Sequence, residues 1–571
     1  MRINISRINC KFVFSVIRHK FFFFVAFYSI LIVAIFNGFQ LGNLYLKAAT
    51  EYNSTSTTEH ENGFTPLIPG RDSIIVYVSS SSGNDASDGS SPQNAVKTLN
   101  CASRLVRDGH NDFMLLQRGD TWRGESLGQF KSGLDAVHPL VIGSYGESSR
   151  RPRIEVKGHF IDHDGQSRSF VAVTGLQIVS FTKIPGDPAF DGATGGGFRY
   201  VGGGTGLLIE DCHILYGELI IQSYGQYHYE NVKIRRNIIE YNYHVNTCGQ
   251  NAAYRPSGMY ASHVTDLTIE GNIFDHNGWN NKIVTACATM YNHNMYLNAN
   301  RLIVRENIIT RASSMGIKIR SDEIGDTNHL VFENNLLAGG EIGLSIGGNT
   351  KEKHRFSSVT IRDNVFTQIG KCNSTKRNFS WMLDVQDNNN TIIEKNYFLH
   401  QPWYTNAYGI RLGGNSESYI AIRGNVFYNL KQRSLYVIPK DEWKHIVISN
   451  NTIVDPSHDS CLIDHQGNFI NVVYQNNRYF SGKGDKWFCV SGVRQTLAQW
   501  ATISGEASAV FWKRKFIDPE RTIGSYATTL GLHNTIEGFI TAVKKQNRLN
   551  WREELTAGVI NDYIRVGFKM H

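Results

Sequence analysis

The sequence predicts an all-β chain wound into a parallel solenoid of about ten or more coils, and three observations lead to that prediction. The first is a repeated phrase of alternating apolar residues, a polar corner, an Asn and another apolar pair, as at residues 267–274, 302–309 and 330–337. The Asn slot holds Asn237, Asn272, Asn307, Asn335, Asn364, Asn396, Asn425, Asn451 and Asn477, with Cys212 in the earliest copy. The nine steps from Cys212 to Asn477 span 265 residues, a mean of about 29, which is typical of solenoids.

The second observation is that the repeated segments alternate with period two and favour Ile, Val, Leu and Phe, which is typical of strands. The third is that no stretch between them keeps a 3.6-residue period long enough for a helix, which argues against leucine-rich, ankyrin and HEAT repeats. A helix-free unit of this length suits one turn of three short strands, each paired with its copy about 4.8 Å away. We expect the Asn side chains to stack along one corner, and Cys212 to be buried and free.

The N-terminal region predicts a membrane anchor. Residues 1–20 are basic, residues 21–36 form an uncharged run of 16 residues that is apolar except for Ser29, and residues 37–42 can extend that run toward the usual spanning length. Positive charge before the run keeps the N-terminus in the cytoplasm, so the rest of the chain would lie on the periplasmic or extracellular side. A cleaved signal peptide, which would make the protein secreted, is the alternative. Residues 43–73 are predicted to be a flexible linker.

Composition gives little support to nucleic-acid binding. The net charge is +8, but six basic residues precede the first acidic one, Glu51, so the body of the chain carries about +2. No Cys and His spacing indicates zinc, and the eight cysteines do not form a small-domain disulfide pattern. A solenoid grows along one axis, so 571 residues need not be divided into several globular domains. We expect a monomer.

Residues 75–482 resemble the right-handed parallel β-helix proteins of the pectate-lyase-like group. The resemblance begins at Tyr77-Val-Ser and continues through the loop of residues 83–89, Lys97-Thr-Leu and Arg118-Gly-Asp-Thr-Trp, and it implies an entrance coil with its cap. The β-helix is therefore expected over residues 74–482. Residues 483–571 show helical periods and are similar to the C-terminal segments of exported bacterial β-helix proteins, which implies a cap over the open end. An uncovered last coil would expose strand edges; a separate binding module is the alternative.

Each coil has a further strand upstream of its Asn, and alternation sends one column of side chains outward. That column is Tyr260, Tyr296, Lys318, Ser345, Asp384, Arg411 and Tyr436, and beside it lie Ser262, Asn298, Arg320, Gly347 and Gln386. Aromatic faces can stack on sugar rings, and Arg pairs with carboxylates in a fork. The sequence therefore predicts a groove for an acidic polysaccharide, with Tyr260, Asn298, Asp384, Arg411 and Tyr436 binding the chain. An ordinary solvated strand face is the alternative.

Residues 275–320 hold the densest set of candidate catalytic groups: His276, His293, Tyr296, Lys318 and Arg320. The blocks around them resemble Asp-His-Asn-Gly, Asn-His-Asn-x-Tyr and Ser-Ser-x-Gly-x-x-x-Arg segments of uncharacterised bacterial β-helix proteins linked to polysaccharides, which implies saccharide chemistry without fixing a reaction. We expect a lyase that performs β-elimination on a uronate-containing polysaccharide, or a C5-epimerase that begins with the same proton abstraction.

In that hypothesis Arg320 binds the carboxylate and stabilises the developing enolate-like charge. Lys318, about 7 Å along the same strand face, takes the proton with a pKa lowered by the neighbouring cation. His293 is the competing base, and Tyr296 would be the acid.

Three alternatives remain open from the sequence. Asp384 and Asp387 could act as the carboxylate pair of a glycoside hydrolase. A membrane-tethered protein that binds glycans without catalysis is the second alternative. Calcium could be held by Asp322, Glu323 and Asp326, although a solvated acidic turn is the preferred interpretation, and no other cofactor is indicated.

Overall fold

The computed structural model describes residues 63–249, 254–321, 327–348, 356–402, 404–512 and 514–570. Leu67–His571 form one compact unit, and the fold below is the fold of that unit. The predicted cytoplasmic segment 1–20, the predicted anchor 21–42 and most of the predicted linker 43–73 lie outside the described residues. None of the helices in the described ranges has both the length and the apolar character that crossing a membrane requires.

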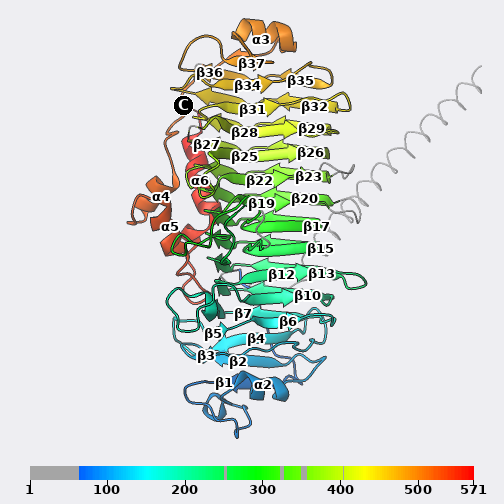
Figure 1. The fold of residues 1–571 in the computed structure, drawn as a ribbon, viewed down its shortest axis with the longest axis vertical. Helices are drawn as coiled ribbons and strands as arrows, with labels where there is room; N and C mark the ends of the chain where they lie inside the picture. The colour runs from blue at the N-terminus through cyan, green and yellow to red at the C-terminus, as the bar shows by residue number, and fades with distance from the viewer. Residues whose placement is uncertain are drawn as a thin grey trace, which may run out of the picture. The chain divides into compact units, whose positions relative to one another are not determined.

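The unit is built from three faces of stacked strands (Figure 1). Strands of the first face pair in parallel with their equivalents one coil away. They are β6 (His159–His163), β9 (Gly197–Tyr200), β12 (Glu218–Gln222), β15 (Met259–Glu270), β17 (Met295–Arg305), β19 (Met315–Ile319), β22 (Ile342–Ile346), β25 (Phe379–Gln386), β28 (Asn406–Gly413), β31 (Arg433–Val437), β34 (Cys461–His465) and β37 (Phe488–Val490), which pairs antiparallel with β38 (Val493–Gln495).

The second face continues from the first, because β15 and β17 run unbroken across both and join them into a sheet of 25 described strands. Its remaining strands are β1 (Ile75–Val78), β2 (Phe113–Gln117), β4 (Leu140–Tyr145), β7 (Val171–Thr174), β10 (Gly204–Glu210), β13 (Tyr229–Arg235), β20 (Asn328–Glu333), β23 (Phe356–Arg362), β26 (Asn388–Glu394), β29 (Ser418–Arg423), β32 (Lys444–Ser449) and β35 (Val472–Gln475).

The third face is a separate parallel sheet with 14 strands among the described residues. They are β3 (Thr121–Arg123), β5 (Arg153–Val156), β8 (Gln177–Ser180), β11 (His213–Leu215), β14 (Ile238–Glu240), β16 (Ile273–Asp275), β18 (Ile308–Thr310), β21 (Leu336–Ala338), β24 (Val365–Thr367), β27 (Tyr397–Leu399), β30 (Val426–Tyr428), β33 (Thr452–Asp455), β36 (Arg478–Ser481) and β39 (Val510–Phe511). One strand per coil on this face confirms the predicted parallel β-helix. Its right-handed winding stays a prediction.

The Asn ladder lies at the corner between the second and third faces and is fully buried. Asn272 shows its chemistry: its side-chain oxygen accepts from the backbone N–H and the amide Nδ2 of Asn237, both at 2.9 Å, while its own Nδ2 donates to the Ile234 carbonyl and to Asn307 Oδ1. Cys212 is buried and free at the first step, as predicted, and its N–H donates to Asn237 Oδ1. At the other end Glu506 accepts from both nitrogens of Asn477.

The residue before each ladder position adopts the left-handed conformation, with φ between 50° and 65°. These residues are Asp211, Arg236, Gly271, Glu306, Asn334, Asp363, Lys395, Gly424, Asn450 and Asn476. A residue other than Gly costs roughly 1–2 kcal/mol in that conformation. Hydrogen bonds of the ladder offset this cost, and the sharp corner is thereby held in register from coil to coil.

Two helices cover the ends of the stack (Figure 1). At the entrance, after η1 (Pro92–Asn94), helix α2 (Leu99–Leu105) begins at Thr98, whose side chain accepts from the Cys101 N–H, and it buries Leu99 and Ala102 in the core. At the far end α3 (Leu497–Ser504) places Trp500, fully buried, on the Phe488 ring at 4.7 Å. Strands β37 to β39 extend the β-helix beyond the expected boundary at residue 482.

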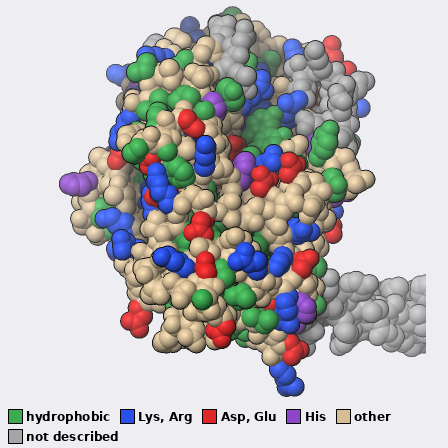
Figure 2. Space-filling model, turned by 60° about the horizontal axis from the view of Figure 1, so that its bottom comes forward, with side chains coloured by type: hydrophobic (Ala, Val, Ile, Leu, Met, Phe, Trp, Pro, Cys, Tyr) green, Lys and Arg blue, Asp and Glu red, His purple; other side chains and the backbone are tan. Residues whose placement is uncertain are grey.

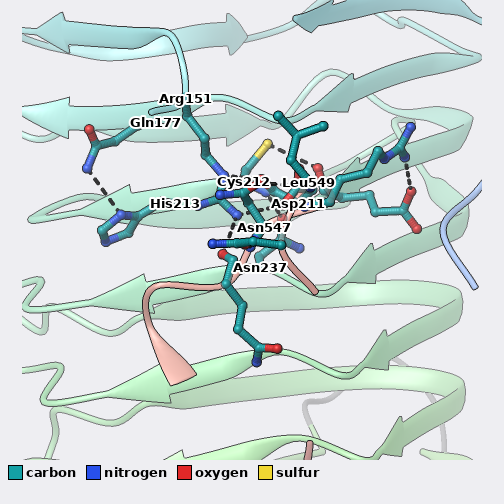
Figure 3. Close-up of polar contacts among 12 residues, drawn as sticks. Arg151, Gln177, Asp211, Cys212, His213, Asn237, Asn547 and Leu549 are labelled. Atoms are coloured by element: carbon teal, nitrogen blue, oxygen red, sulfur yellow. Dashed lines mark hydrogen bonds and ion pairs between the residues drawn. The ribbon is translucent and has the colours of Figure 1, made fainter. Parts of the chain in front are cut away.

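The rest of the C-terminal segment, residues 514–570, is called the C-terminal arm below. Its helices α4 (Ile523–Thr529), α5 (Ile536–Val543), η3 (Glu553–Leu555) and α6 (Ala557–Gly567) lie along the outer side of the third face and form a second hydrophobic core with it (Figure 1). Arg151 donates to Asp211 and to the Gln546 carbonyl, and Asn547 and Leu549 lie beside this pair (Figure 3). Of the predicted cap, only the part around α3 covers the open end.

Charged side chains of both signs are interspersed over the face that Figure 2 shows, without a large area of one sign. Within the described part of the chain, two disulfides, Cys248–Cys287 and Cys461–Cys489, join neighbouring coils.

Candidate functional site

Strand pairing on the first face aligns the outward column in the order that the alternation predicted. Its successive partners are Tyr260 with Tyr296, Tyr296 with Lys318, Lys318 with Ser345, Ser345 with Asp384, Asp384 with Arg411, and Arg411 with Tyr436. We call this row of residues the outer column. It brings together side chains that are far apart in the sequence, because each coil adds one position to it.

Four of the predicted site residues meet around Tyr296. The ring of His293 stacks on the Tyr296 ring with centroids 5.5 Å apart, and the Tyr260 ring lies 5.8 Å away on the preceding coil. Arg320 Nη1 donates to the Tyr296 phenol oxygen at 3.0 Å. Asn298 is buried on β17. The residue before it, Leu297, pairs with Ile319, the residue before Arg320, so Asn298 and Arg320 occupy neighbouring positions on adjacent coils. The cluster joins a guanidinium, a phenol and an imidazole on adjacent coils.

Lys318 is the one lysine of the outer column, and its surroundings change the pKa of its ammonium group. Its Nζ donates to the Ser345 hydroxyl at 3.3 Å and to the Gly347 carbonyl. Burial lowers the Lys318 pKa to about 8, with Asp384 opposing the shift and Arg320 adding to it. A group with a pKa near neutral is suited to general base catalysis because a sizeable fraction is deprotonated while proton transfer stays favourable.

His293 has a different protonation state from Lys318. Burial, together with the Lys318, Arg377 and Arg255 charges, lowers the His293 pKa to about 3, so its ring is neutral at physiological pH. Its Nδ1 accepts from the Met315 N–H at 3.4 Å. A base with so low a pKa gains little from taking a proton. Of the two candidate bases, the geometry and charge therefore favour Lys318.

Asp384 is fully engaged with its neighbours. Its carboxylate accepts from Arg411 Nη1 at 2.8 Å, from Gln386 Nε2 at 2.7 Å and from the Ser345 hydroxyl at 3.4 Å. This network links the Lys318 end of the outer column to the Arg411 end. Asp384 is occupied by these contacts, whereas Arg411 keeps further N–H donors with which it can bind a ligand.

The second carboxylate of the hydrolase alternative, Asp387, supports a loop. One of its oxygens accepts from the backbone N–H groups of Asn415 and Ser416, at 2.6 and 3.2 Å. Both carboxylates are therefore occupied by contacts within the protein, and neither is placed to act as an acid or a base on a ligand at the first face. The arrangement gives no support to hydrolysis by this pair.

Aromatic side chains that the sequence interpretation missed line β25 and β28. The Trp381 ring stacks on Phe379 at 4.5 Å and on Tyr408 at 5.3 Å, and Tyr408 lies 6.3 Å from Tyr436. Trp381 is three residues before Asp384 rather than two, because Met382 and Leu383 are both fully buried and the alternation slips by one. A strict period of two conceals this aromatic shelf; an aromatic three residues before the polar position, repeated at Tyr408, would have shown it.

His276 does not join the other predicted catalytic residues. It follows β16 on the third face, where its ring lies between Tyr241 at 4.6 Å and Trp279 at 4.1 Å, and burial lowers its pKa to about 4. The neighbouring Asp275 bonds Arg311 and Lys544 of the C-terminal arm. This environment gives His276 and Asp275 a packing role.

Asn277 and Asn294, which flank the predicted histidines, form a second short ladder. Asn277 Oδ1 accepts from the Asn242 N–H at 3.0 Å, and Asn277 Nδ2 donates to Asn294 Oδ1, also at 3.0 Å. The predicted calcium ligands Asp322, Glu323 and Asp326 lie outside the described residues. Among the residues that the structure describes, no group of three or more His, Cys, Asp or Glu side chains is arranged to hold a metal ion.

No family model matches the chain, and no curated protein matches it. Among solved structures it is similar to PfbA, a surface adhesin of Streptococcus pneumoniae (TM-score 0.45, 12% identity, 64% of this chain and 86% of that one). It is also similar to a mannuronic acid specific polysaccharide family 6 lyase from human gut microbiota (0.42, 13%, 80% and 94%) and to the Dettilon tailspike protein gp208 (0.40, 12%, 73% and 68%). Similarities at this level do not assign a function to any residue of the chain. The pairing of the strands by itself defines the chain as a parallel β-helix protein.

Proposed function

We propose that the protein binds an acidic polysaccharide along the outer column and cleaves it by β-elimination at Lys318 and Arg320. The observation that carries the proposal is the partly buried Lys318, with its pKa of about 8, beside an arginine that is held to a tyrosine. The partly exposed Trp381 ring, which packs on the buried Tyr408 ring, supplies a stacking surface for a sugar ring. Arg411, at the far end of the column, supplies a donor for a second carboxylate.

The proposed reaction needs only groups of this cluster. Arg320 binds the uronate carboxylate, and neutral Lys318 takes the proton from the adjacent ring carbon. The electron pair of that C–H bond forms the new ring double bond, with charge passing through the carboxylate that Arg320 stabilises. The glycosidic C–O bond breaks, and Tyr296 gives its proton to the leaving oxygen. C5-epimerisation shares the first step and returns a proton to the opposite face of the ring.

The proposal includes export and tethering. The disulfides Cys248–Cys287 and Cys461–Cys489 fit an oxidising compartment, where such bonds persist. The predicted anchor of residues 21–42 would hold the β-helix at the outer side of a membrane.

Product analysis tests the proposal. Full-length protein in detergent is incubated with a panel of uronate polymers, and ultraviolet absorbance reports the unsaturated sugar that elimination creates. Lys318→Met and Arg320→Ala are expected to lower turnover by about 10²–10⁴-fold. The matched variant Lys233→Met, on the exposed side of β13, is expected to behave as wild type. New reducing ends without absorbance, or equal turnover in all variants, would reject elimination at this site.

A further inference from the structure

A second candidate site lies at the corner between the third and first faces. It is a cavity of about 220 Å³ lined by Gln368, Lys371, His400, Gln401, Pro402, Asn429 and Lys431, which we call the corner pocket. Gln368, His400 and Asn429 directly follow β24, β27 and β30, so they stack on three successive coils. The volume is many times the about 10–15 Å³ that one water molecule requires.

Four lining side chains carry a buried polar atom without a hydrogen-bond partner among the described residues: Gln368 Oε1, His400 Nε2, Gln401 Oε1 and Asn429 Oδ1. Gln401 is 1% exposed, and its amide orientation is fixed because Nε2 donates to the Ser380 and Tyr408 carbonyls at 2.8 and 3.1 Å. A buried polar atom without a partner costs roughly 1–3 kcal/mol. Four such atoms around one cavity indicate that something else fills it.

All four atoms are acceptors. Three are amide oxygens, which have no hydrogen to donate. The fourth belongs to His400, whose pKa is lowered by burial against the opposing effects of Glu520 and of a hydrogen bond to the Pro519 carbonyl. That bond uses the ring N–H, so the other nitrogen, Nε2, is an acceptor. A group that satisfies this set must bring several hydrogen-bond donors, as a sugar with neighbouring hydroxyl groups does.

The two lysines add positive charge at the rim. Among the residues that the structure describes, neither the Lys371 nor the Lys431 ammonium has an acidic partner within ion-pair distance. Both side chains line the cavity together with Pro402, whose ring and the lysine stems offer apolar surface. Unpaired ammonium groups beside hydroxyl-accepting oxygens match a ligand that carries hydroxyls and one anionic group.

From these contacts we infer that the corner pocket binds one uronic acid unit, with its hydroxyls on the amide oxygens and its carboxylate at Lys371 and Lys431. The inference rests on the proposed function for the source of its ligand, an acidic polymer. The pocket is coupled to the outer column, because Gln401 bonds the backbones of β25 and β28, the strands that carry Asp384 and Arg411. It would hold a second stretch of the polymer beside the groove.

Calorimetric titration with galacturonate, in protein that already carries Arg320→Ala, isolates this site from the groove. Asn429→Asp is the informative change, because it keeps the shape and the left-handed backbone (φ 58°) while placing a negative charge beside the ligand. We expect affinity to fall at least tenfold. Asn450→Asp, the same change in the same backbone conformation (φ 57°) at the opposite corner, is expected to leave affinity within twofold.

Galactose, which has a hydroxymethyl group in place of the carboxylate, is expected to bind at least tenfold more weakly than galacturonate. Equal affinity of the two sugars, or equal affinity of the Asn429→Asp and Asn450→Asp proteins, would overturn the inference. A crystal soaked with galacturonate that shows only water molecules in the corner pocket would also overturn it. Loss of binding in Asn429→Asp would support the pocket even if the wild-type protein forms no unsaturated product, so the two proposals fail separately.

Discussion

Lys318 shows how the fold tunes a single residue. Its side chain is partly buried on β19, with the Arg320 guanidinium directly after the same strand and the Asp384 carboxylate two coils away. Burial penalises the charged form, and the two neighbours act in opposite directions. The β-helix sets this balance because its register decides which side chain of the next coil lies alongside.

The pH dependence of turnover tests the role of Lys318. The base must be deprotonated, so kcat/KM is expected to rise with pH and to level off above about 8. Asp384→Asn removes the neighbour that holds the Lys318 pKa up, so the rise is expected to move to lower pH. A rise centred near pH 3 would identify His293 as the base. An unchanged profile in Asp384→Asn would show that Lys318 is not the titrating group.

The residues of the outer column could be predicted from the sequence, because period-two alternation along each strand and a constant register between coils determine them. Trp381 and Tyr408 were missed because the buried pair Met382 and Leu383 shifts the alternation, which composition does not reveal. His276 was misplaced for another reason. It is close to Tyr296 in sequence, but one follows a strand of the third face and the other lies on the first, and proximity along a solenoid chain is not proximity in space.

Among the elements, the Asn ladder is the one on which the corner of every coil depends. Asn307→Ala is expected to lower the free energy of unfolding by about 2–4 kcal/mol, because two donors of Asn272 lose their shared acceptor in a buried position. Chemical denaturation measures the change. Asn300→Ala, at a partly exposed position of β17, is expected to cost less than about 1 kcal/mol. Equal effects would show that the ladder adds nothing specific.

Docking of the C-terminal arm depends on a buried charge network. Lys544 bonds both Glu240 and Asp275, which lie 304 and 269 residues earlier. Lys544→Met is expected to destabilise the docked arm by about 3–5 kcal/mol, because two buried carboxylates lose a shared cation. Limited proteolysis should then cut within residues 514–570. Lys545→Met, an exposed neighbour, is the control, and equal protection of the two variants would contradict this account.

The coil and the need for an end cap could be predicted from repeated local patterns. The course of the arm could not, because its contacts join residues hundreds of positions apart whose pairing no local period records. Glu506 is a comparable case: it ends the Asn ladder from within the segment after α3, and nothing in its neighbourhood in the sequence marks it.

At the scale of the whole molecule, three buried histidines make the fold sensitive to acid. Burial is the main cause that lowers the pKa of His163 and His276 to about 4 and of His293 to about 3. In the unfolded chain each titrates near 6.5. Between about pH 6.5 and 4 the unfolded state therefore binds more protons, so stability falls as pH falls through that window. Each histidine contributes a loss of up to about 3 kcal/mol.

Thermal unfolding between pH 7 and 4 measures this dependence. His163→Phe is expected to flatten it, since the ring keeps its edge-on packing against Tyr200 and no longer titrates. His458→Phe, at a partly exposed position, is expected to leave the slope unchanged. A midpoint that stays constant across the window would contradict the burial of neutral histidines.

The central claim is that stacked coils assemble one acidic-glycan site from residues scattered along the chain. The most direct test is a crystal structure with a bound uronate oligosaccharide. The account predicts sugar rings along the first face, with one carboxylate at Arg320, a ring proton toward Lys318, and a ring stacked on Trp381. An oligosaccharide bound elsewhere, with the outer column occupied by solvent alone, would contradict it.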